Sequence, residues 1–404
     1  MNRVSINQSW AFTQAGTASE VNIPHTWNGL DGQNGGNNYY RGNCIYEKTL
    51  FIESDPQKIL YLEVEAANSI ANVYINDVHA GEHRGGYSTF RFNITAYIQF
   101  GEHNDIRIEV DNSHDDSVYP LMADFTFMGG IYRDVHLVYC EPIHIDLEDE
   151  GSCGIYVAQT NVSDQKACLT ISTRLRNATS EAANIFVTTQ LIDHNKSIVA
   201  ETEQHVLVNA TAVLIQELTQ ALTQEHAQAL TLDNPRLWQG VDDPYLYQLI
   251  VEVRQNGNLI DNRTIPTGLR YFEVCPDKGF ILNGKKLPLK GVSRHQDRQD
   301  VGWALNREHQ EKDMAIIQDV GANSIRLAHY QHNQYFYDLC DQAGMVVWAE
   351  IPYITRTSPA ETDGKNALKQ MSELVKQNYN HPGIIFWGIQ NEITIAGKAN
   401  NVDG

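Results

Sequence analysis

The sequence lacks the features that direct a chain to a membrane, a secretion route or a nucleic acid. No stretch approaches the roughly 20 apolar residues of a membrane span, and the first residues hold no apolar signal-peptide core. No basic run is longer than Lys285-Lys286, and 30 Lys plus Arg stand against 50 Asp plus Glu, a net charge of −20. Since binding to phosphate backbones needs clustered Lys and Arg, the composition argues against nucleic-acid partners. It predicts a cytoplasmic protein with a neutral or polar substrate.

The cysteines show neither a metal-binding nor a redox spacing. No CxxC pair occurs, and the six residues lie far apart in the chain. Isolated thiols of this kind are typical of reduced, buried side chains. The sequence therefore predicts no structural zinc and no required cofactor.

Two β-rich regions come first in the 404 residues. In residues 1–140, short alternating strands such as 59–64 and 105–110 predict a β-sandwich, with enough aromatic residues to fill its core. In residues 141–275, about seven strands predict an immunoglobulin-like sandwich. The Ala- and Gln-rich stretch 217–230 has a helical composition, although its position between strands opposes a helix.

From residue 276 onwards the pattern changes to strands that alternate with helices. Strands are expected at 287–292, 324–328, 345–350 and 384–389, and helices at 306–320, 333–343 and 365–379. Continuous apolar strands separated by helices indicate a parallel sheet covered by helices. Residues 276–404 thus predict the first half of a (β/α)8 barrel, which takes roughly 250 residues when complete. An open doubly wound sheet is the alternative, but no Gly-rich phosphate-binding loop follows the first strand.

Ionisable and amide side chains follow each of these parallel strands. In chain order they are Arg294, His295, Gln296 and Asp297, then His329 and Tyr330, then Glu350, then Gln390, Asn391 and Glu392. Barrel enzymes place their active sites at the C-terminal ends of the strands, so these side chains predict one cleft that binds many hydroxyl groups. A carboxylic acid beside an amide suits glycoside hydrolysis, in which an acid protonates the leaving oxygen. From spacing alone, Glu350 is the candidate for the second carboxylate of a retaining mechanism.

Ordered motifs along the whole chain resemble those of family 2 glycoside hydrolases, in particular β-galactosidases. Three lie in the barrel region, at 291–297 (Gly-Val-Ser-Arg-His-Gln-Asp), 323–330 (Asn-Ser-Ile-Arg-Leu-Ala-His-Tyr) and 381–392, which ends Gln-Asn-Glu. Four more lie earlier, at 23–28, 39–42, 129–135 and 234–238. The resemblance implies a sugar-binding jelly-roll sandwich at 1–140, an immunoglobulin-like sandwich at 141–275 and the N-terminal part of a TIM-barrel catalytic domain at 276–404.

The resemblance also implies catalytic roles. Glu392 matches the general acid/base, and Asn391 matches the residue that binds the sugar 2-hydroxyl. The family's nucleophile is a Glu at the end of the seventh barrel strand, whereas this chain stops soon after the fourth. Glu350 therefore becomes a supporting residue, and the nucleophile is expected outside this chain.

Other positions match residues that line the family's sugar pocket. His295 and His329 match histidines that stabilise the transition state, and Arg326 matches an arginine beneath the site. Asp124 matches an aspartate of the N-terminal domain that binds a sugar hydroxyl and sometimes a sodium ion. Some long β-galactosidases bind magnesium just past the third strand, but Ile354 and Arg356 in that segment cannot hold it. No residue is assigned as a metal ligand, and the sequence does not decide whether the site binds a sodium or magnesium ion.

The leading interpretation is the N-terminal portion of a retaining exo-β-galactosidase that hydrolyses terminal β-D-galactosyl residues, as in lactose, by double displacement. A β-glucuronidase or β-mannosidase of the same family is one alternative, and a non-catalytic carbohydrate-binding fragment is another. The expected partners are a β-galactoside and either a second copy of the chain or a segment that completes the half-barrel. Open sheet edges and an uncovered apolar interior favour such association.

Overall fold

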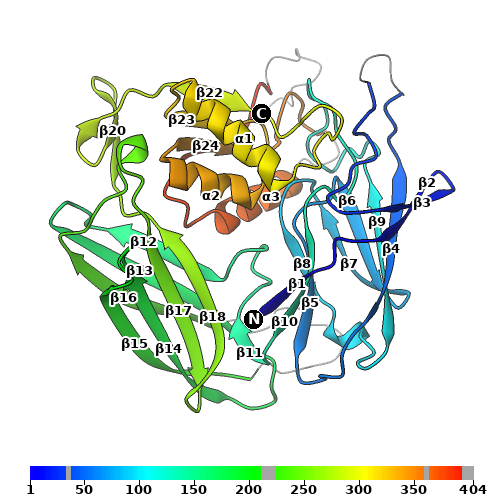
Figure 1. Ribbon diagram of the computed structural model, residues 1–404, viewed down its shortest axis with the longest axis horizontal. Coiled ribbons are helices and arrows are strands. Elements are labelled where there is room, and N and C mark those ends of the chain that lie inside the picture. The colour runs from blue at the N-terminus through cyan, green and yellow to red at the C-terminus, as the bar shows by residue number, and fades with distance from the viewer. Residues whose placement is uncertain (33–37, 211–223, 359–363, 394–404) are drawn as a thin grey trace.

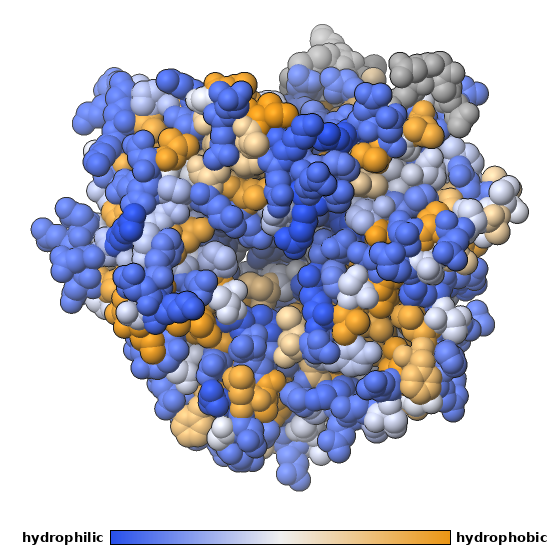
Figure 2. Space-filling model, viewed as in Figure 1, coloured by the Kyte–Doolittle hydropathy of each residue, from blue (hydrophilic) through white to orange (hydrophobic). Residues whose placement is uncertain are grey.

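The computed structural model describes residues 1–32, 38–210, 224–358 and 364–393, which form three parts (Figure 1). The space-filling view shows a hollow where the three parts meet (Figure 2). A cavity of about 660 Å³ lies at this junction, lined by residues of all three parts, Glu63, Cys153 and Gln310 among them. Within the described ranges no helix has the length and apolar character needed to cross a membrane.

The N-terminal part is a sandwich of two antiparallel sheets, ordered β1-β10-β5-β8 and β3-β2-β4-β9-β6-β7. The expected alternation is observed, since Ile106, Ile108 and Val110 point into a core that also buries Trp10 and Tyr46. Its elements are β1 (Asn2–Ser5), β2 (Trp10–Gln14), β3 (Thr17–Val21), β4 (Asn43–Phe51), β5 (Ile59–Val64), β6 (Ile70–Ile75), β7 (Val78–Arg84), β8 (Phe90–Asn93), η1 (Thr95–Tyr97), β9 (His103–Asp111) and β10 (Val135–Cys140).

The second part is another sandwich of two antiparallel sheets. One has β13 at its centre, paired with β11, β12 and β16, and the other is ordered β15-β14-β17-β18. Leu, Ile and Val side chains from both sheets interdigitate between them. Its elements are β11 (Ile143–Ile145), β12 (Ile155–Thr160), β13 (Lys166–Asn177), β14 (Ala183–Ile192), β15 (Ile198–Val208), β16 (Gln224–Asp233), η2 (Gly240–Asp242), β17 (Tyr247–Gln255) and β18 (Asn258–Thr267).

The helical composition of 217–230 does not produce a helix in the portion that the structure describes. Residues 224–233 form strand β16, which pairs with β13 along its full length. Leu230 and Leu232 point from it into the sandwich core. Residues 217–223 lie outside the described residues. Helix propensity is a weak preference, and pairing with a long neighbouring strand overrides it here.

The third part begins the parallel barrel, ordered β22-β23-β24-β25, with three helices against one face of the sheet (Figure 1). A small antiparallel sheet, β19-β20-β21, precedes it. The first parallel strand starts at Gly291 and not at 287, because Pro288 cannot donate a ladder hydrogen bond. The elements are β19 (Phe272–Cys275), β20 (Gly279–Leu282), β21 (Lys285–Lys286), β22 (Gly291–Arg294), α1 (Arg307–Asp319), β23 (Ser324–Leu327), α2 (Gln334–Ala343), β24 (Val346–Glu350), α3 (Lys365–Gln377) and β25 (Ile384–Gly388).

Buried polar contacts hold the jelly-roll against the barrel. Arg133, only 4% exposed, donates from Nη2 to Gln296 Oε1 at 2.8 Å and to the Gln331 carbonyl at 2.9 Å. On α3, Glu373 accepts from Ser88 Oγ at 2.7 Å and lies 3.0 Å from His83 Nε2. The jelly-roll is thus fixed directly beside the segments that follow β22 and β23.

Candidate active site

The four parallel strands end at one edge, as the sequence predicted. Their register pairs Arg294 of β22 with Leu327 of β23, and Glu350 of β24 with Gly388 of β25. This edge brings together the strand-end cluster, which comprises His295, Arg326, His329, Glu350, Asn391 and Glu392.

Successive side chains along each strand point to opposite faces of the sheet, so their order determines which of them lie on the face away from the helices. Ile325 and Leu327 pack against the helices, and so do Val347 and Ala349. Arg326 lies between the first pair and therefore points to the opposite face of the sheet. Trp348 shares that face and is 43% exposed, so the described residues leave this side of the sheet partly uncovered.

Glu350 is the buried centre of the cluster, with no exposed surface. Arg326 donates from Nε to Oε2 at 3.1 Å and from Nη2 to Oε1 at 3.0 Å. His329 Nδ1 lies 2.5 Å from Oε1. Both carboxylate oxygens are therefore engaged, and the spacing-based nucleophile hypothesis for Glu350 does not fit this geometry. A supporting role, which the family resemblance implies, fits it.

Asn391 is held so that its amide nitrogen is available. Arg326 Nη2 donates to Asn391 Oδ1 at 2.7 Å, which orients the amide group. The backbone is anchored by hydrogen bonds to the Tyr353 carbonyl and from the Thr355 N–H, each 2.9 Å long. Nδ2 is buried, and no described residue accepts its hydrogens. This nitrogen is a donor for a group that the protein itself does not supply.

Glu392 follows at the solvent-exposed rim of the site. Its backbone takes a left-handed conformation, with φ of 54°. This conformation costs an L-residue roughly 1–2 kcal/mol. Glu392 is thus an accessible carboxyl residue that directly follows the oriented Asn391 in the chain.

The two histidines face each other across the site. The ring centroids of His295 and His329 lie 5.2 Å apart, with the planes at 73°. Burial and the neighbouring His329 lower the pKa of His295 below its usual value, although nearby carboxylates oppose the shift. His295 is therefore neutral at pH 7.

The jelly-roll reaches the strand-end cluster through the segment that contains residues 124 and 125. The Phe125 ring lies 5.3 Å from His295 and 6.4 Å from His329, measured between centroids. Asp124 is exposed and precedes Phe125 in the chain, and its negative charge opposes the lowering of the His295 pKa. The contacts of Phe125 with both histidines bring this segment of the jelly-roll to the site. The contacts of Phe125 with the two histidines arise only when the jelly-roll docks against the barrel.

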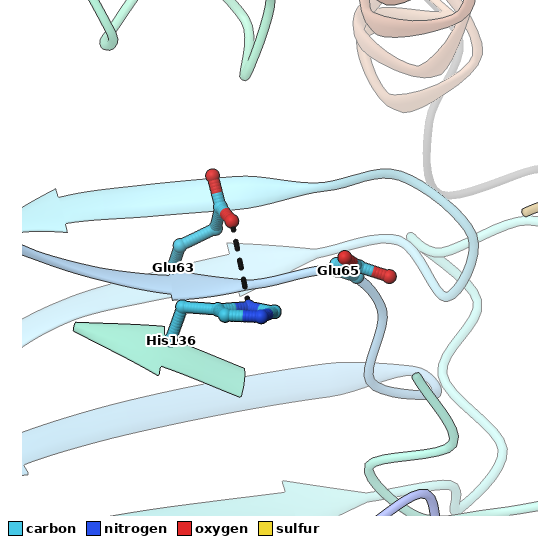
Figure 3. A group of neighbouring side chains, drawn as sticks. All are labelled: Glu63, Glu65 and His136. Carbon is cyan, nitrogen blue, oxygen red and sulfur yellow. Dashed lines mark ion pairs between the residues drawn. The ribbon is translucent and has the colours of Figure 1, made fainter. Parts of the chain in front are cut away.

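A separate group of acidic and histidine side chains lies on the jelly-roll sheet (Figure 3). Glu63, Glu65 and His136 hold their ligand atoms within 4.8 Å of one another. However, Arg3 Nε and Arg91 Nε donate to the two Glu63 oxygens at 2.6 and 2.5 Å. Because two guanidinium groups already neutralise this carboxylate, the donor set does not fit a metal ion. The group is an ion-pair network.

The Glu63 network makes the jelly-roll sensitive to acid. Burial opposes ionisation of Glu63, but Arg91 and Arg3 outweigh it and hold the pKa of Glu63 at about 2. A depressed carboxyl pKa stabilises the fold above pH ~4.5 and loses this effect as the pH falls towards 2. We expect Glu63→Gln to lower the free energy of unfolding by roughly 3 kcal/mol at pH 7, and by progressively less below pH ~4.5, in denaturant titrations at several pH values.

Glu47→Gln is the matched control, because Glu47 is exposed on β4 of the same domain. Its effect should stay within about 0.5 kcal/mol at every pH. A Glu63→Gln penalty that is equal at pH 3 and pH 7 would contradict the linkage argument.

Models of three domains of one enzyme family match the chain in order. They are the sugar-binding domain of glycosyl hydrolases family 2 at residues 2–142, the family 2 domain at 154–270, and the family 2 TIM-barrel domain at 273–403. Together they leave few residues unmatched.

Individual relatives agree with the family models. A β-glucuronidase of Bacteroides fragilis is 40% identical over 98% of this chain and 57% of its own length. A solved structure described as a putative β-galactosidase from Bacteroides fragilis has a TM-score of 0.91 at 35% identity, covering 96% of this chain and 58% of that one. Bacteroides uniformis β-glucuronidase 2, covalently bound to cyclophellitol-6-carboxylate aziridine, has a TM-score of 0.90 at 30% identity, covering 99% and 48%. The chain spans about half the length of these relatives.

Proposed function

Because this chain belongs to glycosyl hydrolase family 2, we propose that it acts in the hydrolysis of terminal β-D-glucuronides by a retaining mechanism. The observation that carries this choice of sugar is the 40% identity to a β-glucuronidase over 98% of the chain. The strand-end cluster supports the reaction class, since it combines an accessible carboxyl group, an oriented amide donor and two histidines.

Glu392 is the proposed general acid/base. It protonates the glycosidic oxygen as the bond to the leaving group breaks, and later takes a proton from the attacking water. The amide of Asn391 donates to a sugar hydroxyl, an interaction that strengthens in the transition state. His295, His329 and Asp124 bind further hydroxyl groups.

The nucleophile of the double displacement is proposed to lie outside the described residues. Glu350 does not qualify, because Arg326 and His329 engage both of its oxygens. A retaining enzyme needs a second carboxylate about 5–5.5 Å from the acid/base. A segment that also covers the exposed face around Trp348 would supply it and complete the barrel.

A β-galactosidase is the second candidate. The similarity to a solved structure described as a putative β-galactosidase favours it, as do the motifs around His295, His329 and Glu392. The described pocket residues offer no feature that selects between a galactosyl hydroxyl and a glucuronyl carboxylate. Arg326 is a pocket cation, but Glu350 already pairs with it.

A panel of 4-nitrophenyl glycosides tests the proposal on the enzyme expressed from its complete coding sequence. We expect kcat/KM for the β-D-glucuronide to exceed those for the β-D-galactoside and β-D-mannoside by at least about tenfold, because a site that binds a charged group rejects analogues without it. The α-D-glucuronide is the control and should not react. Preference for the galactoside would replace the proposal with the second candidate, and sugar binding without any turnover would indicate a carbohydrate-binding protein.

A further inference from the structure

Tyr330 directly follows His329 in the chain and is completely buried. Its hydroxyl has two hydrogen-bond partners among the described residues. The backbone N–H of Gln296 donates to Oη over 3.3 Å, and Nδ1 of His295 lies 3.1 Å from Oη. One hydroxyl thus contacts both the backbone after β22 and a ring of the strand-end cluster.

The direction of the second hydrogen bond follows from the number of protons. An amide N–H can only donate, so Oη accepts from Gln296. Burial raises the pKa of Tyr330 far above its usual value, so the hydroxyl keeps its single proton. The described residues offer this proton one acceptor, Nδ1 of His295. A neutral imidazole that accepts at Nδ1 carries its proton on Nε2.

We infer that Tyr330 is a positioning residue that fixes His295 in the Nε2–H tautomer. Nε2 of His295 has no hydrogen-bond partner among the described residues, so its N–H is a donor available to an oxygen of the bound sugar. The inference rests on the proposed glycosidase function only for its kinetic consequence, since the tautomer itself is a property of the free protein.

His329 takes the opposite arrangement. A carboxylate only accepts, so the 2.5 Å contact between His329 Nδ1 and Glu350 requires a proton on Nδ1. The longer 3.3 Å approach of Arg326 Nη2 to the same nitrogen is then a contact of two donors. The two histidines therefore use Nδ1 in opposite ways, since His329 donates from it to Glu350, whereas His295 accepts at it from Tyr330.

Stacking between the domains holds the Tyr330 ring independently of its hydroxyl. The ring of Tyr87 from the jelly-roll lies parallel to it at 4.5 Å, and Phe125 meets it edge-on at 5.2 Å. Tyr330→Phe therefore removes the hydroxyl while the stack remains. Tyr87 is 1% exposed, and among the residues that the structure describes its own hydroxyl has no hydrogen-bond partner. Tyr87→Phe is consequently a matched control in the same stack.

The kinetic test compares both variants in the enzyme expressed from its complete coding sequence. Tyr330→Phe is expected to lower kcat for the preferred aryl glycoside by about tenfold, the value of one hydrogen bond, with KM changed by less than about threefold. Tyr87→Phe should leave both constants unchanged. Wild-type kinetics in Tyr330→Phe would overturn the inference, whereas an inactive wild-type enzyme would overturn the proposed function and leave the inference to the structural test.

The structural test does not depend on activity or on any variant. Neutron diffraction from deuterium-exchanged wild-type crystals at pH 7 should locate deuterium on Nε2 of His295 and on the Tyr330 hydroxyl, directed at Nδ1. Deuterium on Nδ1 of His295 would overturn the inference even if Tyr330→Phe failed to fold. In crystals of Tyr330→Phe, a mixture of both His295 tautomers is expected; an unchanged Nε2–H form there would show that Tyr330 does not control it.

Discussion

Replacing Glu392 by glutamine is expected to reduce kcat by about 10²–10⁴-fold for an aryl glycoside with a poor leaving group. Glutamine keeps the shape of the side chain but has no proton to give to the leaving oxygen. The change should leave the fold intact, since Glu392 is exposed at the rim of the site. Steady-state kinetics of the full-length enzyme with the aryl glycoside measures the loss.

The identity of the leaving group distinguishes an acid/base from a residue that only binds substrate. A dinitrophenyl leaving group departs without protonation, whereas phenol or an alkyl aglycone needs the proton. In Glu392→Gln the rate of the first step should therefore fall much less with a dinitrophenyl glycoside than with a phenyl or alkyl glycoside. Loss of a residue that only binds substrate would instead lower kcat/KM by the same factor for all of these substrates.

Glu47→Gln is the control for Glu392→Gln, because Glu47 is an exposed glutamate on β4 and does not belong to the strand-end cluster. Its kcat should stay close to that of the wild-type enzyme. Unchanged turnover in Glu392→Gln would remove Glu392 from the mechanism.

The convergence of the strand ends could be predicted from the sequence because it depends on local order. A parallel sheet places all carboxyl ends at one edge, so His295, His329 and Asn391 had to approach one another once the strands were identified. The predicted β24 at 345–350 differs from the observed Val346–Glu350 by a single residue. The fold class is confirmed by the structure and the family models.

Contacts between domains could not be predicted from such local order. Phe125 precedes Tyr330 by more than 200 positions, and nothing in the spacing indicates that their rings meet. Asp124 entered the expected pocket through family resemblance and not through any periodicity. The small sheet β19-β20-β21 was also missed, because its three strands are too short to show an alternation.

The role of Glu350 is another feature that residue spacing did not predict correctly. A glutamate at a strand end is equally consistent with a nucleophile and with the partner of an arginine. Only the geometry separates the two, since both oxygens accept hydrogen bonds within the protein. The roles of Glu392, Asn391 and the histidines stay predictions for the experiments above.

Glu350→Gln is expected to damage both stability and activity. The substitution removes the negative charge from a completely buried position and leaves Arg326 without its counter-ion. Breaking a fully buried ion pair costs about 3–5 kcal/mol, but Arg326 is 35% exposed and keeps part of its hydration, so we expect a loss of about 2 kcal/mol. The amide would also present a donor to Arg326 or His329, so the orientation of Asn391 and His329 would be lost. We expect kcat to fall by at least about 100-fold, the scale of a displaced catalytic group.

A second buried glutamate separates the loss of stability from the loss of activity. Glu373 is 2% exposed and accepts hydrogen bonds from Ser88 and His83, but it belongs to the contact between α3 and the jelly-roll and not to the strand-end cluster. Glu373→Gln should lower the unfolding temperature, as Glu350→Gln does, yet keep kcat within about threefold of the wild-type value, since the reacting groups stay in place. If the two variants lost activity in equal proportion to stability, Glu350 would serve only the fold. A selective loss of kcat in Glu350→Gln would instead mean that this buried carboxylate orients the side chains that contact the sugar.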